Sequence, residues 1–165
     1  LLDCPELFDR PGNPYLDAHG HDWADNGIRF GLLSRVAALL GQPATPLGWR
    51  PDIVHLNDWQ SALAPAWLHY EGGAASVVTV HNIAFQGNFA AGHLSALGLP
   101  EQAWHMHGVE YHGQLSFLKA SVTDGEIPTD HAIGATVYRV AAERGIGFII
   151  SGVAVLNLLS KASVH

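Results

Sequence analysis

Positive charge, cysteine and long hydrophobic runs are all scarce in this sequence. Its 165 residues include 8 Lys plus Arg against 15 Asp plus Glu, which gives a formal net charge of −7. Binding to a nucleic-acid backbone needs a basic surface, so nucleic acid is not an expected partner. No uncharged stretch reaches the roughly 18 apolar residues of a membrane-spanning helix, and the first residues lack a signal-peptide pattern. We therefore expect no membrane partner either.

Thiol and metal-ligand patterns are equally sparse. Cys4 is the only cysteine, which excludes a disulfide within the chain and is compatible with a cytoplasmic protein. The 11 histidines keep a metal open as an alternative, because several cluster within residues 19–21 and 105–112. Their spacing matches no standard zinc site, so ordinary loop histidines are the favoured interpretation. The sequence predicts no cofactor and no metal.

The composition is that of a folded domain. Hydrophobic residues make up 48% of the chain and charged residues 14%, whereas disordered chains are polar and charged. Apolar residues at helical spacing predict a helix over residues 26–40, with Asp25 and Asn26 as caps. A further helix is predicted from residue 114 to about residue 122.

The middle of the chain predicts a strand–helix–strand unit. The apolar run at residues 53–56 is typical of a buried strand, and the β-branched run at residues 76–80 of a strand buried on both faces. Between them a helix is predicted from residue 59 to about residue 70, with Asp58 as its cap. Such a unit nearly always belongs to a parallel sheet, so the predicted fold class is α/β.

Polar side chains follow each predicted strand at its carboxyl end. Asp58 and Trp59 follow the first strand, and His81, Asn82 and Gln86 follow the second. Ligands of open parallel sheets bind at this edge, where we expect Asp58 and His81 to meet. A carboxylate, an imidazole, amides and an indole together suit a sugar, with its hydroxyls and apolar ring faces. The alternative is that Asp58 only caps a helix and His81 is only a loop donor.

Common catalytic patterns are missing from the sequence. The glycines of residues 87–113 form neither a dinucleotide-binding fingerprint nor a P-loop. No Gly-x-Ser-x-Gly motif is present, so serine-based hydrolysis has no support.

Five sequence motifs occur in order along the chain. They are LFDRPGNPY (7–15), DWADNGIRFGLLSR (22–35), PDIVHLNDWQSALAPAWL (51–68), VVTVHNIAFQGNF (77–89) and HGVEYHGQLSFLKA (107–120). In content and order they resemble glycosyltransferase family 5, the bacterial-type glycogen and starch synthases. The resemblance spans residues 1–120, which would be a partial N-terminal, acceptor-side domain.

This resemblance implies a fold, a reaction and partners. The fold would be part of a GT-B glycosyltransferase, with a Rossmann-like parallel sheet and flanking helices facing a C-terminal domain across a cleft. The reaction would be retaining transfer of glucose from ADP-glucose to the non-reducing end of α-1,4-glucan in glycogen biosynthesis, with no required metal. The implied partners are ADP-glucose, the glucan and the C-terminal domain.

The resemblance also assigns roles by position. His81 would hydrogen-bond the donor glucose and stabilise charge near the reacting centre, and Asp58 would help organise the active-site floor. Asn82 and Tyr15 would be weaker polar contributors. An oxocarbenium-like transition state gains from a pre-oriented neutral imidazole beside the sugar, which agrees with the role of His81.

The sequence departs from the family pattern in three places. The family's KTGGL-type glycine loop is absent, as is the C-terminal domain with its Arg and Lys pair at the diphosphate. Residues 121–165 read as a divergent tail, whose origin as a frameshift, a gene fragment or divergence stays open. The apolar stretch 141–164 is expected either to pack on the sheet as a substitute strand or helix, or to drive association.

These departures leave three interpretations of the chain. We expect a member of the synthase family that is incomplete and inactive by itself. The alternatives are a non-catalytic glucan-binding module and a truncated gene product without a stable fold, because an exposed sheet edge would result.

Overall fold

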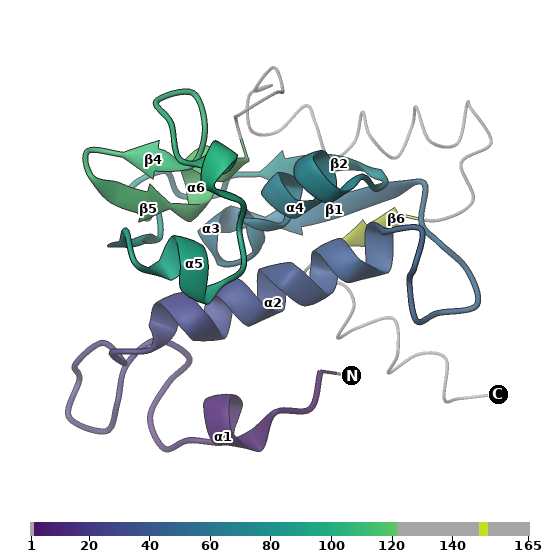
Figure 1. Cartoon of the computed structure of the whole chain (residues 1–165). Helices are drawn as coiled ribbons and strands as arrows, with labels where there is room; N and C mark the ends of the chain where they lie inside the picture. The colour runs from purple at the N-terminus through teal and green to yellow at the C-terminus, as the bar shows by residue number, and fades with distance from the viewer. Residues whose placement is uncertain (1, 122–148, 152–165) are drawn as a thin grey trace, which may run out of the picture.

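The computed structural model describes residues 2–121 and 149–151 of the chain. Its elements, in chain order, are α1 (Pro5–Phe8), α2 (Asn26–Gly41), β1 (Ile53–Asn57), α3 (Asp58–Ser61), α4 (Ala64–Glu71), β2 (Ala75–Thr79), β3 (Asn88–Ala90), α5 (His93–Ala96), the 3-10 helix η1 (Glu101–Ala103), β4 (Glu110–Tyr111), β5 (Gln114–Ser116), α6 (Phe117–Ala120) and β6 (Ile149–Ser151). The strands form a parallel sheet in the order β2-β1-β6 and a second sheet in the order β3-β5-β4, whose pairs are antiparallel. Figure 1 shows α2 running along one side of the parallel sheet.

The parallel pairing of β1 with β2 confirms the predicted strand–helix–strand unit. Ile53 is in register with Ala75, and Asn57 with Thr79. The expected burial of the second strand on both faces is wrong, because Thr79 is its only buried residue. The reason is that β2 lies at the edge of the described sheet and has a strand neighbour on one side only.

Helix α2 agrees closely with the prediction of a helix over residues 26–40. Phe30, Ser34 and Ala38 recur at helical spacing and are buried, where α2 packs against α3, α4 and β1. Asp25 is the N-cap residue, but it makes no side-chain capping bond. Its carboxylate instead forms an ion pair with Arg10 at 2.8 Å.

The helix predicted from residue 59 to about residue 70 is two helices, α3 and α4. Pro65 stands in the first turn of α4. A proline has no N–H to continue the hydrogen-bond ladder of a preceding helix, yet it fits a first turn well. Leu63, at the junction of the two helices, and Trp67 on α4 are both fully buried.

The helix predicted over residues 114–122 begins as a strand. β5 pairs with both β3 and β4, and α6 starts only at Phe117. His112 and Gly113 both have positive φ, at 49° and 78°, which is the conformation of a two-residue hairpin turn. This turn returns the chain alongside β4 and so makes residues 114–116 a strand.

Only four residues of the predicted tail, residue 121 and residues 149–151, lie within the described part. β6 (Ile149–Ser151) pairs in parallel with β1, on the opposite side from β2. This agrees with the expectation of a substitute strand on the sheet. Residues 122–148 and 152–165 lie outside the described residues. In the part that the structure describes, no helix is long and apolar enough to cross a membrane.

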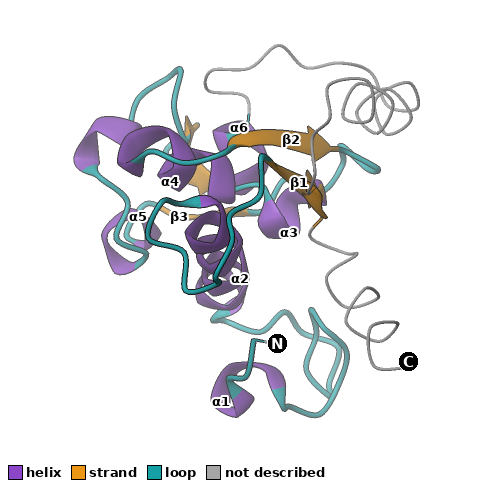
Figure 2. Ribbon diagram, turned by 90° about the vertical axis from the view of Figure 1, so that its right-hand side faces the viewer, coloured by secondary structure: helices purple, strands orange, loops and turns teal. Residues whose placement is uncertain are grey.

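The N-terminal segment lies against the side of α2 that faces away from the strands. Figures 1 and 2 show α1 and its loops beyond α2 in two perpendicular views. The core lies on the other side, where Trp67, Phe117 and Leu56 are the largest fully buried side chains. Two layers therefore meet at α2, the strands on one face and the N-terminal segment on the other.

Gly87 gives a direct test of packing between β2 and β3. Its φ is +62°, and an added Cβ would overlap the Trp59 ring and lie 3.2 Å from the Cβ of Phe117. Overpacking typically costs about 1–3 kcal/mol, and a side chain in the left-handed region roughly 1–2 kcal/mol more. We expect Gly87→Ala to lower the free energy of unfolding by about 2–5 kcal/mol in urea titrations.

The matched control is Gly92→Ala. A Cβ at Gly92 meets no atom within 4 Å, and its φ is −59°. If the two variants unfold at the same urea concentration, the packing argument for Gly87 is wrong.

Candidate functional site

The carboxyl ends of β1 and β2 bring the predicted residues together. Asn57 and Thr79 are paired at the ends of the two strands. One residue further on, Asp58 Oδ1 accepts hydrogen bonds from the backbone N–H of His81 at 2.6 Å and of Asn82 at 3.3 Å. The meeting of Asp58 and His81 that the sequence predicts is therefore observed.

Asp58 reaches the neighbouring loop because its own backbone is unusual. Its φ is +52°, a left-handed conformation that is uncommon for a residue with a side chain and that Asp and Asn tolerate best. Asn57 takes the N-cap position of α3, without a side-chain capping bond. The alternative in which Asp58 only caps a helix is thus wrong, because its carboxylate binds the loop after β2.

The His81 ring is held from the β1 side. Its Nε2 lies 3.0 Å from Asn57 Oδ1. An amide oxygen only accepts, so the hydrogen bond requires a proton on Nε2, and a neutral ring then keeps Nδ1 as an acceptor. The residue is exposed, and its ring is therefore oriented and open to a ligand.

Asn82 shapes the loop that carries His81. Its Oδ1 accepts from the Ala84 N–H at 3.0 Å, and its carbonyl oxygen from the Phe85 N–H at 3.3 Å. These bonds turn the chain directly after His81 and leave Ile83 and Phe85 exposed by 73% and 62%. The side-chain oxygen of Asn82 is thus engaged within the loop, and its contact with a substrate stays a prediction.

Tyr15 comes to the same region from the N-terminal segment. Its hydroxyl accepts a hydrogen bond from Gln60 Nε2 at 2.8 Å. Its ring stacks on Phe30 with centroids 5.6 Å apart and lies 6.2 Å from Trp59. Gln60 is two residues from Asp58 on α3, so this short helix links Tyr15 to the strand-end site.

Trp59 and Gln86 are placed differently from the other predicted residues. Trp59 is half-buried among Phe30, Phe89 and Phe117, with centroid distances of 4.7–6.3 Å. The backbone oxygen of Gln86 accepts from the Leu118 N–H at 3.0 Å. Both residues thus help to hold the site together, and their contact with a substrate stays a prediction.

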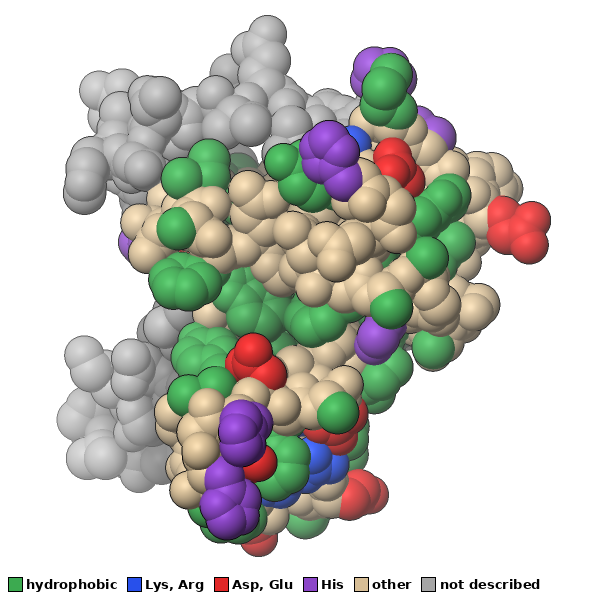
Figure 3. Space-filling view, turned by 90° about the vertical axis from the view of Figure 1, so that its left-hand side faces the viewer, with side chains coloured by type: hydrophobic (Ala, Val, Ile, Leu, Met, Phe, Trp, Pro, Cys, Tyr) green, Lys and Arg blue, Asp and Glu red, His purple; other side chains and the backbone are tan. Residues whose placement is uncertain are grey.

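The histidines do not converge on a metal-binding geometry within the described part. Among residues 2–121 and 149–151, no group of three or more His, Cys, Asp or Glu side chains is arranged to hold a metal ion. Figure 3 shows histidine side chains at separate places on one face of the molecule, around a hollow lined by hydrophobic side chains.

His55 is a buried neighbour of the site, although the sequence alone indicates only that it belongs to an apolar strand. It lies on β1 with 5% of its surface exposed, and its Nε2 is 2.8 Å from Thr79 Oγ1. Burial lowers the pKa of His55 below the usual 6.5, and the nearby His81 lowers it further. The neutral form of His55 is therefore favoured in the fold.

This lowered pKa predicts a loss of stability in acid. Below about pH 6.5 the unfolded chain protonates His55 while the folded chain does not, so the unfolded state gains stability as the pH falls. We expect the Tm to fall between about pH 7.5 and pH 5.5, and to fall less in His55→Gln, whose amide can still bond to Thr79. Equal falls in the two proteins would rule out this contribution of His55.

The chain belongs to the starch synthase catalytic domain family, which matches residues 1–124. It is 77% identical over 122 residues to the glycogen synthase of Dechloromonas aromatica, covering 74% of this chain and 25% of that protein. It is 56% identical over 167 residues to the glycogen synthase of Nitrosomonas eutropha, covering 99% of this chain and 32% of that protein. The chain thus spans about a quarter to a third of the length of these curated relatives.

A solved structure shows the same fold. The catalytic domain of starch synthase IV from Arabidopsis thaliana, bound to ADP and acarbose, matches with a TM-score of 0.54 and 22% sequence identity. The match covers 79% of this chain and 30% of the plant chain. Together with the parallel sheet, it confirms the predicted α/β fold of a partial GT-B domain.

Proposed function

We propose that this chain is the acceptor-side part of a glycogen synthase, which transfers glucose from ADP-glucose, with retention, to the non-reducing end of α-1,4-glucan. The observation that carries the proposal is the strand-end geometry of Asp58 and His81 in a member of the starch synthase family. The low cysteine content favours a cytoplasmic location for this activity.

The geometry suggests separate roles for His81 and Asp58 in the reaction. The His81 ring, oriented by Asn57, offers one nitrogen to the donor glucose as positive charge develops at the reacting carbon. Asp58 holds the loop that carries His81 by accepting two backbone N–H groups. Asn82 and Tyr15 contribute weaker polar contacts to the substrate.

Binding of the donor diphosphate calls for more positive charge than the described residues offer. A departing diphosphate needs positive charge beside it, and four of the five cations in the described part, all except Arg50, already have partners. Arg10 pairs with Asp25, Arg35 pairs with Glu71, Arg29 bonds to backbone carbonyls, and Lys119 donates to the carbonyl of Glu110. We therefore propose that the partner of this chain is a C-terminal donor-binding domain, and that the chain is inactive without it.

A chimeric enzyme tests this function. The aligned 122-residue stretch of the Dechloromonas aromatica glycogen synthase is replaced by the matching part of this chain. Incorporation of glucose from radiolabelled ADP-glucose into glycogen is then compared with the native enzyme. We expect comparable activity, because the exchanged part would supply His81, Asp58 and Tyr15 in the same arrangement.

Two further proteins complete the test. The 165-residue chain alone is expected to give no incorporation above background. The chimera with His81→Ala should have the unfolding temperature of the parent chimera and little activity. A chimera that is folded and binds glycogen but transfers no glucose would refute the proposed function and favour a glucan-binding module.

A further inference from the structure

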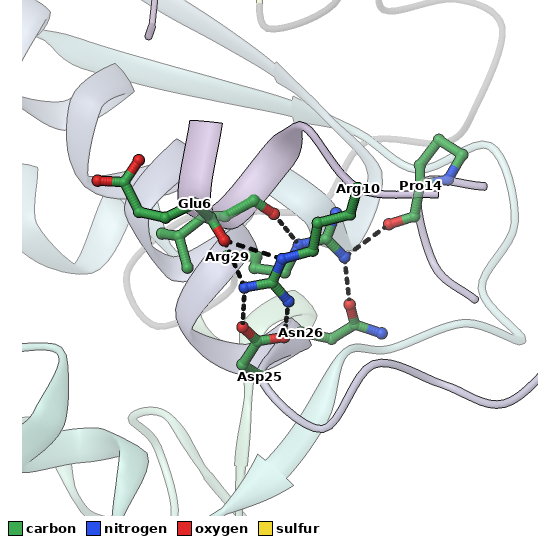
Figure 4. A network of polar contacts seen from close by, with 7 residues as sticks. Glu6, Arg10, Pro14, Asp25, Asn26 and Arg29 are labelled. Atoms are coloured by element: carbon green, nitrogen blue, oxygen red, sulfur yellow. Dashed lines mark hydrogen bonds and ion pairs between the residues drawn. The ribbon is translucent and has the colours of Figure 1, made fainter. Parts of the chain in front are cut away.

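Arg29 is a buried cation that forms no ion pair with a carboxylate of the described residues. It stands in the first turns of α2 with 4% of its surface exposed. Its Nε donates to the Leu7 carbonyl at 2.7 Å, and its Nη1 donates to the Pro14 carbonyl at 2.9 Å and to Asn26 Oδ1 at 2.7 Å. Figure 4 shows these bonds reaching from α2 to the N-terminal segment. A buried charge is costly, so its hydrogen bonds must compensate for lost hydration.

Asn26 extends this arrangement to Tyr15. Because its Oδ1 accepts from Arg29, its N–H₂ group is turned the other way and donates to the Tyr15 carbonyl at 2.9 Å. Arg29 thus fixes which end of the amide faces Tyr15. Two successive carbonyls, those of Pro14 and Tyr15, are held by two neighbouring side chains of one helix.

The Tyr15 side chain then reaches the site itself. With its carbonyl held at α2, Tyr15 places its hydroxyl on Gln60 and its ring on Phe30. Gln60 and Asp58 share helix α3, whose first carboxylate holds the His81 loop. A continuous series of contacts therefore runs from Arg29 to the strand-end site.

We propose that Arg29 and Asn26 are positioning residues that hold Tyr15 beside the Asp58–His81 edge for contact with the substrate. This inference rests on the proposed function, because it assigns Tyr15 to the substrate-binding face. The competing explanation is that Arg29 and Asn26 only anchor the N-terminal segment and matter for stability alone.

Asn26→Asp separates the two explanations in the chimera. The carboxylate keeps the size of the amide and still accepts from Arg29, so the anchor remains. It loses the N–H₂ donor and turns an oxygen toward the Tyr15 carbonyl, so that of the two donors to this carbonyl only the Trp23 N–H, at 3.1 Å, remains and the hold on Tyr15 is weakened. We expect kcat/KM for the glucan to fall by about 3- to 10-fold, the effect of losing one hydrogen bond.

Two measurements identify Tyr15 as the residue through which Asn26 acts. In a Tyr15→Ala background, Asn26→Asp should have no further effect on kcat/KM, because coupled residues are not additive. In protein labelled with 3-fluorotyrosine, Asn26→Asp should move the fluorine resonance that Tyr15→Phe removes. This second readout does not depend on activity, so it tests the positioning even if the chimera transfers no glucose.

The control is Arg10→Gln, which breaks the neighbouring ion pair with Asp25 without touching Tyr15. It should leave both kcat/KM and the Tyr15 resonance as in the parent. Arg29→Lys, which cannot reach three acceptors in one plane, should reproduce the Asn26→Asp effects with an added loss of stability. The inference is overturned if Asn26→Asp lowers only the Tm, if its effect adds to that of Tyr15→Ala, or if Tyr15→Ala leaves kcat/KM unchanged.

Discussion

Replacement of His81 by alanine in the chimera is expected to lower kcat by about 10²–10³-fold, the usual effect of removing one preorganised group that stabilises developing charge. The loss should fall on kcat, because the ring acts on charge that is present only in the transition state. The loop should survive the substitution, since Asp58 binds the backbone N–H of residue 81 and not its ring. Steady-state kinetics with varied glucan would therefore show a slow enzyme with a nearly unchanged KM.

His107→Ala is the matched control for this prediction. His107 is also an exposed loop histidine, but its neighbour is His105, with ring centroids 6.5 Å apart. We expect this variant to retain the kcat of the parent. If His81→Ala is as active as His107→Ala, then His81 has no place in the active site.

The sheet could be predicted from the sequence because its strands are short apolar runs with turn residues on either side. Residues 53–57 and 75–79 contain β-branched side chains and are separated by one helical stretch, which leaves few arrangements other than a parallel pair. The start of β5 was missed because Leu115, Phe117 and Leu118 fit a helical spacing as well as a strand. The turn at His112 and Gly113 decides between the two, and a positive φ at histidine is rare enough to escape a sequence pattern.

The strand-end site was predictable for a topological reason. Adjacent parallel strands end at the same edge, so Asp58 and His81 had to approach each other although 23 residues separate them. The left-handed backbone of Asp58 was not predictable, because the same residue is an equally good helix cap. The choice depends on the two N–H groups that the loop after β2 presents, and these are long-range contacts.

The role of Arg29 lay beyond sequence patterns for a similar reason. An arginine on an amphipathic helix is usually a solvated residue, and nothing local shows that a loop will cover it. Its acceptors at Leu7 and Pro14 lie 22 and 15 residues away, one in the short helix α1 and the other in the loop that follows it. Only the folded chain brings these carbonyls to one guanidinium group.

Substitution of Asp58 separates the function of its charge from that of its geometry. Asp58→Gly keeps the positive φ without strain but removes the acceptor for the N–H groups of His81 and Asn82. Hydrogen bonds to a charged group contribute about 1.5–3 kcal/mol, so we expect kcat/KM of the chimera to fall by about 10- to 100-fold. Asp58→Asn keeps an acceptor oxygen at the same place and tolerates the same backbone conformation, so its loss should be no more than a few-fold.

The relative activities of these variants show how Asp58 acts. If its oxygen positions the His81 loop, Asp58→Asn should be slightly less active than the parent and Asp58→Gly much less active. Asp58→Ala should be the least stable of the three variants, because it adds strain at a φ of +52°. The activity of Asp58→Gly should then be limited by the mobility of His81, so a second substitution, His81→Ala, would cost less in this background than in the parent. An Asp58→Asn enzyme as slow as Asp58→Gly would contradict the positioning role, because only the negative charge distinguishes Asp58 from an asparagine that accepts the same two bonds.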